Sequence, residues 1–225
     1  KVVKILSKKT NLKKKDYVLD IASNDGSLLN FYNKHVNTFG IDPILNKYKE
    51  NYKHIKYKIS DFFSAQKIKK ITKKKFTIIS ALSVFYDTVD PDKFIKDVKN
   101  LLSDNGIFLL EFADLESIIK NKMFDTICHE HLEYYSSKVI LDLCDKNNLR
   151  VFDIKKNDIN GASKQYFICH KVSKYKENKK NIFQILDSER KFKLADEITF
   201  KKFIYEINLS KKKLVNFLKK AIKNN

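Results

Sequence analysis

The sequence is poor in the residues that break or cross-link a chain. Its 225 residues include only four glycines and two prolines, which excludes collagen-like and loop-rich architectures. The three cysteines, Cys128, Cys144 and Cys169, form neither an even set nor a CxxC pair. We therefore expect free thiols in a reducing compartment, with the cytoplasm as the default location.

Long apolar runs are also missing. No stretch approaches the roughly 20 apolar residues that a membrane-spanning helix needs, and the chain begins at Lys1 without the apolar core of a signal peptide. The sequence therefore predicts a protein that neither spans a membrane nor carries an export signal.

Arginine is scarce although basic residues are abundant. The chain has 46 lysines and arginines against 27 acidic residues, a formal net charge of +19, which by itself favours a polyanionic partner. Only Arg150 and Arg190 are arginines, yet arginine is the favoured side chain for two-pronged contacts to phosphate and guanine. Lysine, asparagine, isoleucine and phenylalanine have codons made of A and T alone, so an AT-rich genome explains much of the charge. The composition argues against nucleic acid as the partner.

Hydrophobic residues make up 43% of the chain, enough for a real core. The first 112 residues alternate short apolar runs with helix-like stretches, which is typical of a parallel sheet with helices on its faces. Asp90-Pro91 supplies a capping residue and a proline at the first helical position, and we expect 103–106 to stop the helix that follows. We expect strands at 17–22, 38–42, 55–58, 76–82 and 106–112.

The second half of the chain has a different pattern. Helices are expected at 115–122 and 136–147, around a polar and aromatic stretch at 124–135 that suits a site better than a core. Two strands, 150–155 and 164–170, are expected to pair antiparallel at the sheet edge through Asn160-Gly161. From 182 onward the apolar spacing predicts one helix, packing on the domain or on a second copy or partner, with a membrane surface less favoured. We predict an α/β fold with a mostly parallel seven-stranded sheet, a domain at 1–172 and a C-terminal helical extension at 173–225.

A ligand site is expected at the carboxyl end of the first strand, where open α/β sheets bind ligands. The sequence there is Asp20-Ile-Ala-Ser-Asn-Asp-Gly26, and its small residues Ala22, Ser23 and Gly26 allow a ligand to come close. The three-glycine dinucleotide signature is absent, and Asp20 and Asp25 would repel a diphosphate. A ligand with a cationic centre or an amino group suits them better.

Two further acids follow the next two strands. Asp42, in Gly40-Ile-Asp42-Pro43, stands 22 residues after Asp20, the spacing of an acid that binds ribose hydroxyls. Asp61-Phe62 places a carboxylate beside an aromatic ring, as an adenine would require. Each acid alone is explained by helix capping, but the three together predict a nucleoside-like ligand.

These residues resemble the class I methyltransferases that use S-adenosylmethionine. The resemblance implies a Rossmann-like methyltransferase fold with S-adenosylmethionine as cofactor and S-adenosylhomocysteine as product. It also implies a set of cofactor-binding residues, which are Asp20, Ala22, Ser23, Asn24, Gly26, Asp42, Pro43, Asp61, Phe62, Ala81, Leu82 and Ser83.

Within that class, Asn24-Asp25-Gly26, the stretch from Phe124 to His131 and Asn160-Gly-Ala-Ser163 are similar to sugar C-methyltransferases that act on nucleotide-linked keto-sugars. Members of that family carry an N-terminal zinc-binding domain and a C-terminal domain that holds the nucleotide-sugar. We expect this chain to be the central catalytic module, beginning after the first domain and ending before the second. Cys128 stands where the family has a tyrosine, and Asp87 where it has a histidine, so transfer to oxygen is favoured over transfer to carbon.

Methyl transfer requires a base that takes a proton from the acceptor. We expect His131 or His129 in that role, since histidine titrates near neutrality, with Glu130 orienting an imidazole or the acceptor. A metal site formed by the histidines and Cys128 is the alternative, but no zinc-like spacing completes it, and no metal is predicted. The expected substrate-binding residues are Tyr86, Asp87, Cys128, Tyr134 and Tyr135.

The expected function is methylation of a sugar-like small molecule or glycan in bacterial capsule, surface-polysaccharide or nucleotide-sugar biosynthesis. The acceptor atom could instead be a phosphate- or phosphoramidate-type oxygen on a capsule sugar. Two different functions stay open beside these. One is methylation of RNA, and the second is a non-catalytic subunit that docks on a partner through its C-terminal helix.

Overall fold

A seven-stranded mixed sheet forms the centre of the computed structural model, which describes residues 1–223 except for the side chain of Asn160. The strand order is β3-β2-β1-β4-β5-β7-β6, and β7 runs antiparallel to both of its neighbours. The order reverses between β1 and β4, where ligands bind in such sheets. The predicted fold class and the antiparallel pair at the edge are confirmed. The strands are β1 (Tyr17–Ile21), β2 (Asn37–Ile41), β3 (Tyr57–Ile59), β4 (Phe76–Leu82), β5 (Leu102–Phe112), β6 (Leu149–Asn157) and β7 (Ser163–His170).

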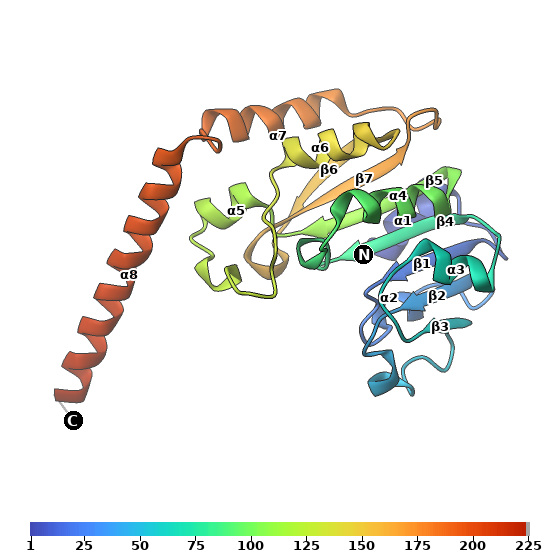
Figure 1. The fold of residues 1–225 in the computed structure, drawn as a ribbon, viewed down its shortest axis with the longest axis horizontal. Coiled ribbons are helices and arrows are strands. Elements are labelled where there is room, and N and C mark those ends of the chain that lie inside the picture. The colour runs from blue at the N-terminus through green and yellow to red at the C-terminus, as the bar shows by residue number, and fades with distance from the viewer. Residues whose placement is uncertain (224–225) are drawn as a thin grey trace.

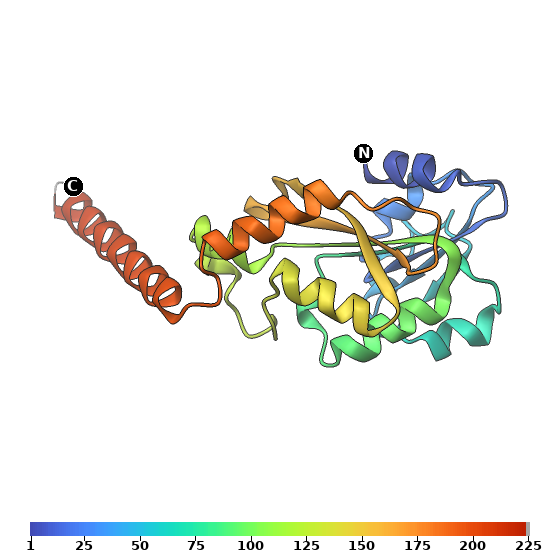
Figure 2. The ribbon, with the colours of Figure 1, turned by 90° about the horizontal axis from the view of Figure 1, so that it is seen from above.

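Helices cover both faces of this sheet (Figures 1 and 2). One buried cluster joins the sheet to α3, α4, α6 and α7, and a second joins the other face to α1 and α2. Successive residues of β1 belong to opposite clusters, with Val18 in one and Leu19 in the other, because side chains alternate along a strand. The helices are α1 (Val2–Thr10), α2 (Ser27–Asn30), α3 (Ala65–Ile71), α4 (Pro91–Leu101), α5 (Leu115–Lys120), α6 (Ser137–Lys146), α7 (Lys179–Lys191) and α8 (Glu197–Lys223), and the 3₁₀ turns are η1 (Leu45–Tyr48), η2 (Phe85–Asp87), η3 (Phe124–Thr126) and η4 (Ile159–Gly161).

The start of α4 follows the prediction. The Asp90 carboxylate accepts a hydrogen bond from the Lys93 amide at 2.9 Å, and Pro91 occupies the first turn. The end of α4 differs, because residues 103–106 form the beginning of β5 instead of a loop. The pairing of β5 with β4 shifts register between Phe76 and Ile78, which accommodates these additional residues in the strand.

The expected single helix from 182 onward was wrong, because α7 and α8 are separate helices. Lys193 adopts a left-handed φ of 55°, and the turn allows Leu194 to pack with Ile118 and Ile119 of α5. In α7, Ile182 and Ile185 are buried in the core, so the first part of the expected extension packs as part of the domain. The domain limit at 172 stays a prediction.

Helix α8 extends away from the rest of the protein (Figures 1 and 2). Phe203 near its start is buried against α5, but residues 208–223 are all exposed. They carry an apolar stripe without a partner in the described chain, formed by Leu214, Phe217, Leu218 and Ile222. Among residues 1–223, no helix is both long enough and apolar enough to cross a membrane.

Candidate functional site

Asp20 lies at the carboxyl end of β1 and is 5% exposed. Its carboxylate accepts a hydrogen bond from the Ser80 hydroxyl of the neighbouring strand at 2.6 Å. The pKa of Asp20 is raised to about 7, chiefly by burial; the hydrogen bond from Ser80 lowers it and the nearby Asp42 raises it. Near neutral pH this carboxyl group therefore changes charge easily, and a positive charge nearby would ionise it.

The turn of residues 20–26 follows β1 and has an unusual backbone. Ala22, Asn24 and Gly26 have positive φ angles of 55°, 46° and 75°, a conformation that glycine tolerates best. A Cβ atom on Gly26 would lie 2.8 Å from Ile55 Cδ1, so no larger residue fits without movement. The main chain here is thus bent into a fixed loop at the carboxyl edge of the neighbouring strands β1 and β4.

Tyr52 holds this turn in place, and no sequence motif pointed to it. Its hydroxyl donates to the Asn24 carbonyl at 2.8 Å, which leaves it as the acceptor for the Ser23 hydroxyl, also at 2.8 Å. Tyr52 is completely buried. It stands 28 residues from Asn24 in a stretch without strand or helix periodicity, so no local signal could have revealed the contact.

Asp42 lies beside the same turn, at the end of β2. Its carboxylate accepts from the amides of Asn24 at 2.9 Å and Ile44 at 2.8 Å, and the residue is 6% exposed. Within residues 1–223, neither Asp20 nor Asp42 forms an ion pair with a lysine or arginine. Two nearly buried acids without a basic partner favour a ligand that carries positive charge or hydroxyl donors.

The other residues predicted on this side lie nearer the surface. Asp61 forms an ion pair with Lys67 at 2.7 Å and also accepts from the Phe62 amide. The Phe62 ring is 73% exposed and Pro43 is exposed. These residues would form an outer rim around the turn of residues 20–26.

The end of β4 lies next to β1 in the sheet. Ala81 is completely buried in the core, whereas Leu82 and Ser83 are half-buried. Ser83 has a positive φ of 55°, and its amide donates to the Glu111 carbonyl at 2.8 Å. The chain therefore turns sharply after β4 and leads into Tyr86.

The segment 124–135 returns to this strand end. The amides of Leu132 and Glu133 donate to the Tyr86 carbonyl at 2.9 and 3.2 Å. The rings of Tyr86 and His131 pack with their centroids 4.0 Å apart. The polar stretch singled out in the sequence is thus brought to the carboxyl edge of the sheet.

A pocket of about 390 Å³, called the Tyr86 pocket below, lies between this segment and the strand ends. Its size is in the range of small-molecule sites. Four predicted site residues line it, together with four others, of which Asp125 and Thr126 belong to the stretch 124–135 that the sequence singled out. The full lining is Tyr86, Ala113, Ile118, Asp125, Thr126, Cys128, His131 and Tyr134.

Four of the eight predicted catalytic and substrate-binding residues do not line this pocket. His129 and Glu130 are exposed, and Asp87 is also exposed. Partial burial raises the pKa of Asp87, while His131 lowers it and Glu130 raises it. Tyr135 does not line this pocket, since its ring is buried against Phe85 with centroids 4.9 Å apart, and its role toward a substrate stays a prediction.

A larger hollow of about 670 Å³ lies between α1 and α2. Val2, Lys4, Phe31 and His35 are among its lining residues, and none of the predicted site residues is. The chemistry-bearing side chains gather at the Tyr86 pocket and the turn of residues 20–26 instead.

Comparison with protein families decides which class of protein this arrangement represents. Residues 1–154 match the model of the methyltransferase domain, and residues 158–225 match that of the C-methyltransferase C-terminal domain. The chain belongs to the methyltransferase family. The expected resemblance to S-adenosylmethionine-dependent methyltransferases and the expected Rossmann-like fold are confirmed. The second match corrects the expectation that the chain ends before the C-terminal domain.

Curated and solved proteins agree with this family. The methyltransferase is 26% identical to the C-methyltransferase NovU of Streptomyces niveus over 206 residues, covering 90% of this chain and 49% of the relative. The chain thus spans about half the length of that relative. Among solved structures, it resembles an S-adenosylmethionine-dependent methyltransferase from Clostridium acetobutylicum, with 14% identity, a TM-score of 0.59 and coverage of 75% and 89% of the two chains. It also resembles the magnesium protoporphyrin IX methyltransferase of Synechocystis with bound S-adenosylhomocysteine, with 15% identity, a TM-score of 0.55 and coverage of 75% and 80%.

The turn of residues 20–26 fits the cofactor of this family. S-adenosylmethionine carries a sulfonium and an amino group, and Asp20 is a buried carboxyl group whose raised pKa a nearby positive charge would lower. Asp42 offers free acceptor capacity on its carboxylate for ribose hydroxyls, beyond the two amides it already binds. The individual cofactor contacts stay predictions.

Proposed function

We propose that this methyltransferase transfers the methyl group to a hydroxyl of a sugar-like acceptor held in the Tyr86 pocket. The placement of His131 carries the proposal, since this is the one predicted base that both lines the pocket and lies against the strand end next to β1. Biosynthesis of bacterial capsule, surface polysaccharide or nucleotide-sugars is the setting that such an acceptor suggests.

S-adenosylmethionine supplies an electrophilic methyl group when it is bound. His131 would accept the acceptor's hydroxyl proton on a ring nitrogen, because a neutral imidazole has one ring nitrogen with a free lone pair. Tyr86 packs against the imidazole at 4.0 Å between ring centroids and limits its rotation. Thr126 and Tyr134, both on the pocket wall, donate their hydroxyl protons to the carbonyls of Met123 and Thr126. Their oxygens would accept hydrogen bonds from the remaining hydroxyls of a sugar.

Transfer to carbon is a second candidate, and the comparisons favour it. NovU is a C-methyltransferase by name, and residues 158–225 match a C-methyltransferase domain. The same His131 could remove a proton from the carbon beside a keto group. Cys128 on the pocket wall replaces the tyrosine of the resembling family, and this substitution supports oxygen as the acceptor atom.

The two candidates are separated by the product and by solvent exchange. The enzyme is incubated with ¹³C-methyl S-adenosylmethionine and a panel of nucleotide-linked hydroxy-sugars and keto-sugars. An O-methyl carbon resonance in the product supports the proposal. A C-methyl resonance, with uptake of deuterium from D₂O at the carbon beside the keto group, would replace it with the second candidate. Labelling of neither class, by protein that binds the cofactor, would contradict both.

A further inference from the structure

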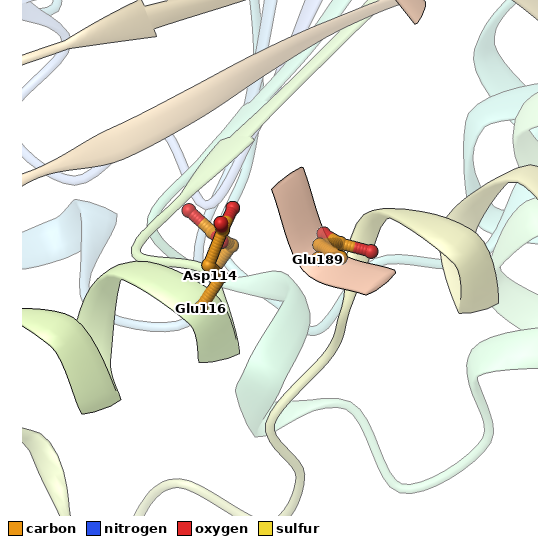
Figure 3. A group of neighbouring side chains, drawn as sticks. All are labelled: Asp114, Glu116 and Glu189. Carbon is orange, nitrogen blue, oxygen red and sulfur yellow. The ribbon is translucent and has the colours of Figure 1, made fainter. Parts of the chain in front are cut away.

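The ammonium group of Lys164 is buried at a junction of four elements. Lys164 lies near the start of β7 with no exposed surface. Its Nζ atom is 2.8 Å from Asp114 Oδ1, 2.9 Å from Glu116 Oε2 and 3.1 Å from Glu189 Oε1. It also donates to the Ser137 hydroxyl at 3.1 Å. These five residues are called the Lys164 cluster below, and Figure 3 shows its three acids.

The three carboxylates lie close enough together to share a cation, and the Lys164 ammonium supplies that positive charge. Burial lowers the pKa of Lys164, but the charges of Asp114 and Glu189 and the hydrogen bonds to Asp114 and Glu116 together raise it, and the net shift is upward. Burial raises the pKa of Glu116, while hydrogen bonds from Lys120, Ser188 and Lys164 bring it down to about 2. Lys164 and Glu116 are therefore charged over the physiological range, and loss of one partner would leave buried charge uncompensated.

The Lys164 cluster brackets the loop that carries His131. On one side of the loop, Asp114 caps α5 by accepting from the Ser117 amide at 3.3 Å. On the other side, Ser137 is the first residue of α6, and its amide donates to Glu189 Oε1 at 2.7 Å. Helix α5 and the loop of residues 121–136 that follows it both lie between these two points.

The loop itself is closed by further main-chain contacts. The Leu115 amide donates to the Tyr135 carbonyl at 2.9 Å, and Tyr86 accepts from the Leu132 amide. The path of the main chain through His131 is therefore set by where α5 and α6 begin. Lys164 contacts both helix starts and α7 at once, in addition to the direct bond from Ser188 of α7 to Glu116 of α5 at 2.5 Å.

We propose that Lys164 is a positioning residue for the acceptor side of the reaction. By tying Asp114, Ser137 and Glu189 together, it sets the path of residues 121–136 and thus the place of His131 on the Tyr86 pocket. The expected effect of Lys164 on turnover rests on the proposed function. The expected effect of Lys164 on the loop of residues 121–136 does not depend on that function. The turn of residues 20–26 follows β1, which lies three places from β7 in the strand order, so the cofactor side should not depend on Lys164.

The test replaces Lys164 by methionine, which keeps the length of the side chain and removes its charge. Lys191→Met is the matched control, because Lys191 pairs with Asp187 at 2.8 Å on the exposed side of α7. The first readout is the rate at which a thiol reagent modifies Cys128. This thiol is half-buried in the Tyr86 pocket, whereas Cys144 and Cys169 are completely buried. The rate therefore reports opening of the loop without any need for an acceptor.

In folded Lys164→Met protein we expect Cys128 to react about tenfold faster, since a loop whose two flanking helices are held less firmly opens more often. We expect kcat to fall by roughly 100-fold, the scale of a small misplacement of a catalytic group. Cofactor affinity and the behaviour of Lys191→Met should stay within about twofold of wild type. Unchanged Cys128 reactivity and unchanged kcat in folded Lys164→Met protein would overturn the proposal, because a merely structural lysine lowers the melting temperature without moving either.

Glu189→Gln is the second variant, in case Lys164→Met does not fold. It keeps the ammonium and two carboxylates but weakens the tie to the Ser137 amide, so Cys128 should react about three- to tenfold faster. Failure of both variants to fold would assign the cluster a purely structural role and overturn the proposal. Faster Cys128 labelling in protein that methylates no tested sugar would contradict the proposed function and leave the positioning role intact.

Discussion

The turn of residues 20–26 and the Tyr86 pocket lie at neighbouring strand ends, but different kinds of contact hold them. The turn is fixed by direct hydrogen bonds from Tyr52 and Asp42 to its own main chain. The pocket is fixed indirectly, by a loop whose ends depend on the Lys164 cluster and whose middle rests on Tyr86. The difference suggests that cofactor binding is built on a rigid element, whereas the acceptor side can be loosened without unfolding the protein.

Replacement of His131 by alanine should give the largest difference between the effect on turnover and the effect on cofactor binding. We expect turnover to fall by roughly 100- to 10,000-fold, the usual contribution of a general base, while cofactor affinity stays within about twofold. The measurement is single-turnover methyl transfer with the acceptor found in the labelling screen. His129→Ala is the control, because His129 is exposed and does not line the pocket. Equal losses in the two variants would contradict the assignment of the base to His131.

Asp42→Ala should have the opposite effect, because it should weaken cofactor binding at the turn of residues 20–26 and leave the Tyr86 pocket intact. Loss of a nearly buried carboxylate that we predict to bind the ribose hydroxyls should weaken cofactor binding by roughly 100-fold, the scale of one or two charged hydrogen bonds. Equilibrium dialysis with labelled S-adenosylmethionine gives the dissociation constants. Asp61→Ala should cost less, about tenfold at most, since Asp61 is partly exposed and already paired with Lys67. A larger loss for Asp61→Ala than for Asp42→Ala would reverse our view of which acid matters.

The pKa of Asp20 makes the stability of the folded protein depend on pH. Its pKa in the folded protein is about 7, against 3.8 for the free group, so the folded state holds a proton that the unfolded state has already lost. Asp20 therefore lowers the stability of the wild type progressively as pH rises from about 4 to about 7. Asp20→Asn removes this dependence and should gain about 3 kcal/mol more at pH about 8 than at pH about 5. Urea unfolding at the two pH values measures it, and an equal gain at both would mean that Asp20 is ionised throughout.

The smallest effect is expected on α8. Leu214→Ser and Phe217→Ser replace side chains that are 59% and 66% exposed, so each should change the free energy of unfolding by less than about 0.5 kcal/mol. Urea unfolding of the isolated chain provides the measurement. Phe203→Ser, at a buried position of the same helix, is the control that should lower the free energy of unfolding clearly. A large destabilisation by Phe217→Ser would show that a second surface covers the stripe.

Much of the fold was predictable because its signals are local. Apolar runs marked β4 and β5, and Asp90-Pro91 marked the start of α4. The acids Asp20 and Asp42 could be found because they follow strand ends directly. The break between α7 and α8 escaped prediction because a non-glycine residue, Lys193, adopts the left-handed conformation there, and no sequence pattern indicates it.

The rest of the site depends on contacts between distant residues. Tyr52 reaches the turn of residues 20–26 from 28 positions away, and Lys164 meets Asp114 across 50 positions of the chain, from 114 to 164. Tyr135 resembles a pocket wall in the sequence beside Tyr134, yet its ring turns into the core against Phe85 while Tyr134 lines the pocket. Which of two adjacent tyrosines faces inward is set by packing against distant elements, and the local sequence does not encode it.

The most direct test of the account is calorimetric titration of S-adenosylmethionine into the wild-type protein and into His131→Ala. We predict binding of similar affinity in both, because the cofactor side is held by Tyr52, Asp42 and Asp20 and not by the His131 loop. Absence of binding in folded wild-type protein would contradict the cofactor site itself. Loss of binding in His131→Ala would contradict the separation of the two regions.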